Sequence, residues 1–275
     1  MRFICLLGLS IILLTGTSRA QFIWNDGAHN SSYSDPGNWT GGVVPPSGSN
    51  IVIGTMNSGD VVGLDTGSDV NVSSWTFSST LNTLGNPVAV FNDGLEQLNI
   101  TGATGIANSS NLQNEFDVVV NAATNTNLSG GSAGINFQSG LNLSHFNVTT
   151  SGTVTIAANQ NLIFDLNSTS TYGRIGSVVA TSAVLVVHNN GYTANAHAGD
   201  TFDLTTGNFN GAVLGSLPTL SGGLMWDTSQ LFSSGIISVY AVPEPSSYAL
   251  LLGGLVLIIA FKRRPSFARI ISRKR

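Results

Sequence analysis

The sequence predicts an all-β protein with a single β-solenoid body, preceded by a signal peptide and followed by one transmembrane helix. Three observations predict this organisation. Residues 21–241 contain short runs rich in Val, Ile, Phe and Thr between Gly and Asn residues, a pattern typical of strands and turns. No window in this region shows sustained helical periodicity. Each end of the chain holds an apolar segment beside basic residues.

The N-terminus has the parts of a secretory signal peptide over residues 1–20. Arg2 precedes an apolar run at residues 3–14, and Ser18-Arg19-Ala20 closes the segment. The run is well short of the ~20 residues that cross a bilayer, so we expect export by Sec-type machinery and cleavage after Ala20. Cleavage removes Cys5, the only cysteine, and the mature chain is then expected to hold no disulfide and no thiolate metal site.

The exported body, residues 21–241, reads as a series of short strands. Most of its apolar runs have four to eight residues and are bounded by Gly or Asn. We expect strands at residues 50–53, 88–91, 117–120, 141–148, 153–156, 162–166, 183–187 and 236–239.

Two arrangements of these strands are open, a β-solenoid and a β-sandwich. Runs that begin at Asn99, Asn142 and Asn161 recur along the body, and the last two are roughly 20 residues apart, which suits one coil of a β-helix. Stacked Asn side chains form hydrogen-bonded ladders, and long charged side chains are nearly absent, so we favour the solenoid. Because the repeat is degenerate, the β-sandwich stays the alternative.

The charge of the body excludes several classes of function. Residues 21–242 hold thirteen acidic residues against one basic residue, Arg174, a net charge of −12. A nucleic-acid binder needs a basic face, and an acidic body repels polyuronates. A lyase acting on acidic sugars also needs cationic side chains. We therefore expect a protein that is not an enzyme, with no catalytic residue, no cofactor and no metal site.

The C-terminus combines an apolar run with a basic cluster. Residues 248–261 carry no charge, and seven basic residues follow before the end of the chain. We expect a transmembrane helix at about residues 246–261 and a cytoplasmic tail at residues 265–275. The positive-inside rule then leaves residues 21–242 outside, as the signal peptide also requires. The basic stop after the helix is Lys262, Arg263 and Arg264.

Residues 242–264 resemble the PEP-CTERM sorting signal of Gram-negative bacteria. The resemblance depends on the order of three features: Pro243-Glu244-Pro245, an apolar helix and a basic cluster. It implies recognition by an exosortase-like processing enzyme, transient anchoring in the inner membrane, processing near Pro-Glu-Pro, and delivery to the cell surface or an extracellular polysaccharide matrix. The tail at residues 265–275 exceeds the usual short basic end.

Both ends of the body resemble autotransporter-type β-helical passenger regions. The opening carries Phe22-Ile23-Trp24 and the run from Asp35 to Gly42, and the closing segment carries the runs at residues 199–204 and 223–231. A true autotransporter ends in a membrane β-barrel, whereas this chain ends in a single apolar helix, so self-translocation is not implied.

Our hypothesis is an exported structural protein of the cell surface or extracellular matrix. A carbohydrate-binding matrix protein is the alternative, with extracellular polysaccharide as its partner and Trp24 and Trp39 stacking on sugar rings. We favour the interpretation that these tryptophans cap the open end of the β-stack. A polysaccharide-degrading β-helix enzyme ranks third.

Overall fold

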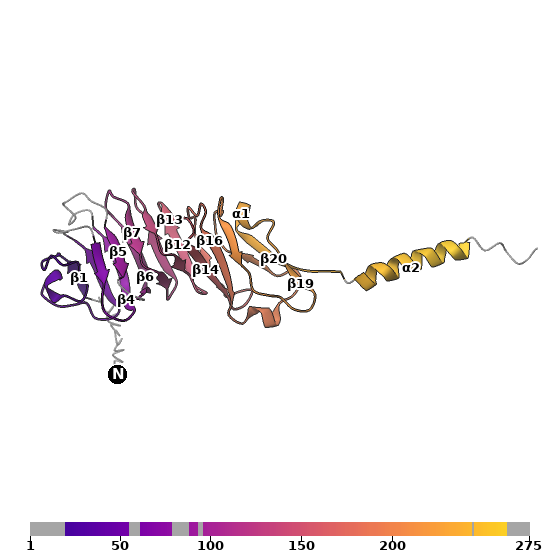
Figure 1. Cartoon of the computed structure of the whole chain (residues 1–275), viewed down its shortest axis with the longest axis horizontal. Helices are drawn as coiled ribbons and strands as arrows, with labels where there is room; N and C mark the ends of the chain where they lie inside the picture. Colours follow the sequence, from indigo (N-terminus) through magenta and orange to yellow (C-terminus); the bar gives the residue numbers. More distant parts are fainter. Residues whose placement is uncertain (1–19, 55–60, 79–87, 93–95, 244, 263–275) are drawn as a thin grey trace, which may run out of the picture.

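The computed structural model describes residues 20–54, 61–78, 88–92, 96–243 and 245–262. The body is an elongated stack of strands with β1 (Gln21–Trp24) near one end, and the helix α2 (Pro245–Lys262) projects from the other end (Figure 1). The predicted signal peptide, apart from Ala20, and the predicted tail at residues 265–275 lie outside the described residues.

The main sheet runs the length of the body and all its strand pairs are parallel. Its neighbours in space are one coil apart in the sequence, which is the arrangement of a solenoid. In spatial order the strands are β1, β2 (Ser49–Ile53), β4 (Val70–Phe77), β6 (Leu98–Asn108), β8 (Val120–Ala122), β11 (Leu141–Asn142), β14 (Asn161–Leu166), β16 (Val184–Asn189) and β18 (Val213–Ser216).

Two further rows of parallel strands complete the coils. The chain visits the three rows in a fixed order, so that β7, β8 and β9 form one coil, β10 to β12 the next, and β13 to β15 the one after. One row contains β3 (Val61–Leu64), β5 (Ala89–Asn92), β7 (Asn114–Asp117), β10 (Ile135–Phe137) and β13 (Val154–Ile156). The other contains β9 (Thr126–Ser129), β12 (Asn147–Ser151) and β15 (Arg174–Ile175). The predicted β-solenoid is thus confirmed, and the sandwich alternative is excluded.

The core is built from side chains that stack in register from coil to coil. From β6 to β16, Cα partners along the main sheet are 21 to 23 residues apart and place buried apolar side chains above one another: Leu98, Val120, Leu141, Leu162 and Leu185. In the second row the rings of Phe116 and Phe137 are stacked with centroids 5.5 Å apart. Alternate residues point outward, so each short strand buries one face.

Asparagine side chains form a ladder between coils, as the sequence predicts. Asn99 Nδ2 donates to Asn71 Oδ1 at 3.0 Å, and Asn121 Nδ2 donates to Asn99 Oδ1 at 2.9 Å. The Cα partner of Asn142 on the next coil is Ile163, and not Asn161. The ladder is therefore made of asparagines that are Cα partners on successive coils. Asn161 lies two residues before the ladder position of its coil, which Ile163 occupies.

Two expected strands are wrong because a coil must turn corners. Residues 117–120 contain the end of β7 and the start of β8, and residues 141–148 are divided into β11 and β12. The second corner has Ser144 at φ +49° and a hydrogen bond of 2.9 Å from its N–H to Asn142 Oδ1. Strands at the other six expected runs are confirmed within a few residues.

The last sheet differs from the coils because its strands are antiparallel. It consists of β17 (Thr201–Asp203), β20 (Ile236–Ala241) and β19 (Leu224–Asp227), with β20 in the centre. We call it the terminal sheet. A bridge from Ile175 to Thr205 joins it to the last coils, so the terminal sheet closes the end of the stack from which α2 departs.

Substitutions at two glycines with similar backbone angles test how closely the coils approach each other. Gly105 (φ +68°) lies where an added Cβ would overlap the backbone carbonyl oxygen of Asn127, whereas Gly67 (φ +69°) has no atom within 4 Å of that position. We expect Gly67→Ala to cost about 1 kcal/mol of backbone strain, and Gly105→Ala a further ~1–3 kcal/mol of overpacking. Urea unfolding of the full chain measures both; equal losses would contradict the close coil contact.

Candidate functional site

The terminal sheet buries one face in an aromatic cluster. Phe202 of β17 packs edge-on against Tyr192 with centroids 4.7 Å apart, and Trp226 of β19 lies 5.9 Å from each of these rings. Trp226 Nε1 donates to the carbonyl oxygen of Pro218 at 2.7 Å. This cluster fixes the three strands against the last coil. It therefore also fixes the positions of the side chains on the outer face of the terminal sheet.

Asp200 connects the loop before β17 to this cluster by hydrogen bonds. Its Oδ2 accepts a hydrogen bond of 2.7 Å from the Tyr192 hydroxyl and one of 2.8 Å from the backbone N–H of His197. Burial raises the pKa of Tyr192, and the hydrogen bond and charge of Asp200 raise it further. The phenol therefore stays protonated at neutral pH and keeps donating to Asp200.

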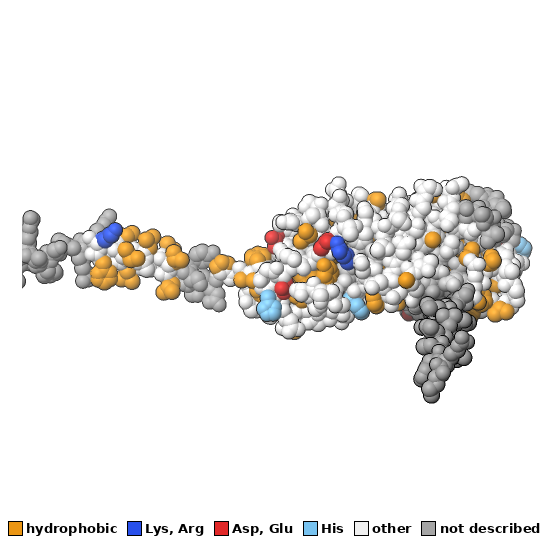
Figure 2. All heavy atoms as spheres, turned by 180° about the vertical axis from the view of Figure 1, so that it is seen from behind, with side chains coloured by type: hydrophobic (Ala, Val, Ile, Leu, Met, Phe, Trp, Pro, Cys, Tyr) orange, Lys and Arg blue, Asp and Glu red, His pale blue; other side chains and the backbone are white. Residues whose placement is uncertain are grey.

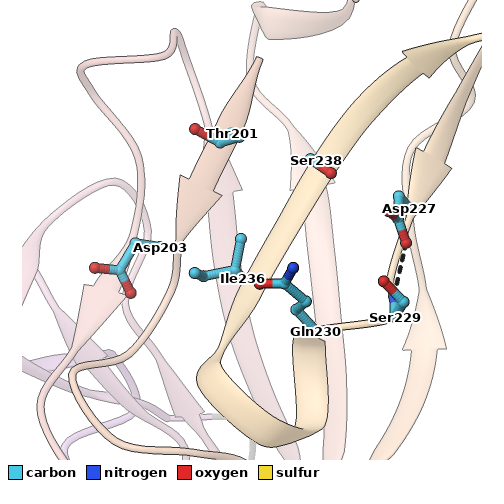
Figure 3. Close-up of a pocket in the computed structure, with 7 residues that line it drawn as sticks. All are labelled: Thr201, Asp203, Asp227, Ser229, Gln230, Ile236 and Ser238. Carbon is cyan, nitrogen blue, oxygen red and sulfur yellow. Dashed lines mark hydrogen bonds between the residues drawn. The ribbon is translucent and has the colours of Figure 1, made fainter. Parts of the chain in front are cut away.

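The other face of the terminal sheet carries a pocket of about 270 Å³. It opens over β20 and has side chains from all three strands and from the turn after β19 (Figure 3). Six of the seven lining side chains are polar. The lining residues are Thr201, Asp203, Asp227, Ser229, Gln230, Ile236 and Ser238.

Two carboxylates lie on opposite sides of this pocket. Asp203 is paired with Arg174, the only basic residue of the body. Asp227 accepts a hydrogen bond of 2.9 Å from the backbone N–H of Ser229. The Ser229 side chain and this N–H hold the pKa of Asp227 below its usual range, so the carboxylate is ionised at neutral pH.

A short link joins the terminal sheet to α2. The N–H of Val242 still donates to the Gly223 carbonyl oxygen at 2.8 Å, and α2 begins at Pro245. Only residues 243 and 244 separate the last sheet hydrogen bond from the helix. Pro243 is exposed. Any enzyme that reads the Pro-Glu-Pro segment must work directly beside the terminal sheet.

The helix α2 extends away from the body (Figure 1). Its apolar residues are spread around the helix axis and form no single stripe. Lys262 is its last residue. Large apolar side chains are exposed along it: Leu250, Leu251, Leu252, Leu255, Val256, Leu257, Ile258, Ile259 and Phe261. Among the described residues, no helix meets both the length and the apolarity needed to cross a membrane.

Residues 241–264 match the family model of the PEP-CTERM protein-sorting motif. The chain carries a PEP-CTERM motif. The match begins at the last residue of β20 and agrees with the predicted boundaries of 242–264. A PEP-CTERM motif marks a protein for exosortase-mediated processing and for sorting to the cell surface, so the predicted sorting motif is confirmed. None of the curated proteins and none of the solved structures compared with the chain matches it.

Several residues of the sorting motif fall outside the described part of the chain. These are Glu244, Arg263 and Arg264, and the side chain of Pro245 is not described either. Ala20 is exposed directly before β1, and residues 1–19 lie outside the described residues. Cleavage after Ala20 and the basic stop at residues 262–264 stay predictions.

The aromatic residues proposed for sugar stacking are buried. Trp24 is 0% exposed and Trp39 is 1% exposed, and their rings meet edge-on at 5.1 Å. Trp39 Nε1 donates to the Tyr33 carbonyl oxygen at 2.8 Å. Neither ring presents a face to solvent, so the sugar-stacking hypothesis at Trp24 and Trp39 is not supported. Trp24 is the last residue of β1 and Trp39 is bridged to it, a position at the end of the stack that fits the cap interpretation.

The sequence analysis missed the pocket of the terminal sheet. Asp203 and Asp227 lie in the runs at residues 199–204 and 223–231, which the sequence marks only as parts of a closing segment. In the structure Asp200 accepts a hydrogen bond from Tyr192, whereas Asp203 lines the pocket. Within the described residues, no group of three or more His, Cys, Asp or Glu side chains is placed to hold a metal ion.

Replacing Trp39 distinguishes a cap from a ligand site. We expect Trp39→Ala to lower the free energy of unfolding by about 3–5 kcal/mol, because a buried ring and its hydrogen bond are lost. Tyr240→Ala, at a ring that is 43% exposed, is the control and should cost about 0.5 kcal/mol. Denaturant unfolding of the full chain checks this, and a stable Trp39→Ala protein would contradict the cap.

Proposed function

We propose that this chain is an exported structural protein of the cell surface or extracellular matrix, released or attached after processing near Pro243-Glu244-Pro245. The observation that carries the proposal is the match at residues 241–264, which starts where the folded body ends. Sec-type machinery exports the chain, the C-terminal segment holds it briefly in the inner membrane, and an exosortase-like enzyme acts at the link.

The composition and surface of the solenoid support a scaffolding role. The face of the body in Figure 2 is mostly free of charged side chains, and the only basic side chain of the body is paired with Asp203. Parallel coils give a long, stiff, polar body whose stability rises with each neighbour contact. We propose a molecule that is not an enzyme and that acts by its shape and surface. The autotransporter resemblance stays a prediction.

The character of α2 supports a transient membrane stage. Its 18 residues span about 27 Å, which is less than the ~30 Å of a hydrocarbon layer, so we propose that the long basic side chains that follow it complete the membrane segment by reaching the interface. Exposed leucine and isoleucine side chains on every side favour lipid over water. Lys262 and the basic residues that follow it in the sequence favour the cytoplasmic side.

Intact mass spectrometry of the protein from its own cells tests the proposal. We expect the wild-type protein to end near residues 243–246 and to be found outside the inner membrane. Glu244→Ala should leave the full C-terminus in the membrane fraction, because the processing enzyme no longer recognises the link. Glu115→Ala is the matched control, since it removes the same side chain on β7, far along the chain from the motif, and should be processed as the wild type is.

Two outcomes would overturn the proposal. Retention of residues 246–275 in the wild-type protein would mean a permanent anchor at the membrane. Equal processing of wild type and Glu244→Ala would mean that the Pro-Glu-Pro segment is not what the enzyme reads.

A further inference from the structure

The outer face of the terminal sheet has an ordered sequence of side chains. Thr201 and Asp227 are both Cα partners of Ser238, so two hydroxyls and a carboxylate form one row across the three strands. Alternate residues of β20 share a face. Ile236 and Tyr240 therefore flank Ser238 on the same surface, about 7 Å away along the strand.

An exposed apolar pair borders the pocket on one side. Tyr240 is the Cα partner of Met225, and these side chains are 43% and 51% exposed. The Tyr240 hydroxyl lies 3.8 Å from Met225 Sδ, a contact that holds the ring across the two strands. The surface thus combines an exposed aromatic ring, Tyr240, with the polar row of Thr201, Ser238 and Asp227, which lies two residues away along β20.

This combination fits a carbohydrate. Sugar rings have apolar C–H faces that pack on aromatic rings and hydroxyl edges that bond to carboxylates, amides and hydroxyls. The ionised carboxylate of Asp227 provides an acceptor of the kind that makes stronger hydrogen bonds, and the Asp203 side chain adds acceptor oxygens across the pocket. Thr201, Ser238 and Gln230 add groups that both donate and accept. A volume of about 270 Å³ is just below the range of drug-sized pockets, and so suits a single sugar ring.

The electrostatics of the face exclude an anionic ligand. Two carboxylates line the pocket, the body carries a net charge of −12, and its one basic side chain, Arg174, is already bonded to Asp203. An acidic sugar or a phosphate would be disfavoured by the Asp227 carboxylate and by the net charge of the body. The ligand that the face accepts is uncharged.

We infer that the outer face of the terminal sheet binds a neutral glycan, with one sugar ring over Tyr240 and the next in the pocket beside Asp227. The site differs from the tryptophans considered from sequence, and it does not depend on processing at the link. It places a glycan contact at the end of the body that is nearest to the sorting segment.

Isothermal titration calorimetry with defined hexasaccharides tests the site. The full chain is purified in a zwitterionic detergent without a sugar headgroup, and maltohexaose, cellohexaose, chitohexaose and the anionic hexagalacturonate are the probes. We expect at least one neutral probe to bind with a Kd of about 1 mM or tighter. Its affinity should be insensitive to salt, because no ion pair forms with the ligand, and hexagalacturonate should not bind.

Three variants and a control assign the binding to this face. Asp227→Asn and Tyr240→Ala should each weaken binding about tenfold, the size expected for loss of a charged hydrogen bond or a stacking ring. Tyr240→Phe should retain most of the affinity, because it keeps the ring. Asp117→Asn is the control: it removes an exposed carboxylate from β7, where Asp117 accepts a 3.3 Å hydrogen bond from Ser139.

The inference is overturned if no neutral probe binds at about 10 mM, or if hexagalacturonate binds more tightly than the neutral probes. It is also overturned if Asp227→Asn and Tyr240→Ala keep the wild-type affinity, or if Asp117→Asn weakens binding as much as they do. Thermal unfolding of each variant shows that a loss of affinity is not a loss of fold.

Discussion

Parallel pairing between successive coils is the interaction on which the rest of this structure depends. A single coil, which is 21 to 23 residues long between β6 and β16, exposes both its backbone edges and its apolar interior, so it is stable only between two neighbours. Registered rows such as Leu98, Val120 and Leu141 and the ladder of Asn71, Asn99 and Asn121 satisfy both needs. The same requirement explains the glycines at close approaches, where any side chain would separate the coils.

Because a stack has two ends, the pairing also determines where unusual structure must occur. At one end Trp24, Tyr33 and Trp39 cover the first coil, and at the other the antiparallel terminal sheet covers the last. That second cap also carries the two features on which our proposals depend, the pocket and the link to the sorting motif. Its buried face is fixed by aromatic packing, its outer face holds the pocket, and its central strand leads within two residues into the processing segment. A body cut from its helix would therefore keep the pocket beside its new C-terminus.

The sequence predicts the features that depend on local pattern. Short runs of β-favouring residues predict the all-β class, recurring asparagines predict a ladder, and the ordered Pro-Glu-Pro, apolar and basic segments predict the sorting motif. Features that depend on which strands pair, and in which register, are not predicted.

Residues 117–120 read as a strand because Val118, Val119 and Val120 suit one, yet a coil corner is required there. Asn161 resembles a ladder position but lies two residues from it. Thr201, Asp227 and Ser238 form one row only through antiparallel pairing, and burial alone distinguishes a capping tryptophan from a sugar-binding one.

Disulfide formation between adjacent coils tests the central claim most directly. Asn99 and Asn121 are Cα partners on neighbouring parallel strands, about 4.8 Å apart and within the 4.4–6.8 Å that a disulfide spans. Asn99 and Asn142 lie two coils apart, roughly 10 Å. In a chain with Cys5→Ser, the stacked account predicts rapid oxidation of the Asn99→Cys, Asn121→Cys pair and none of the Asn99→Cys, Asn142→Cys pair. Failure of the first pair to oxidise, or equal oxidation of both, would contradict the coil register on which the caps, the pocket and the link all depend.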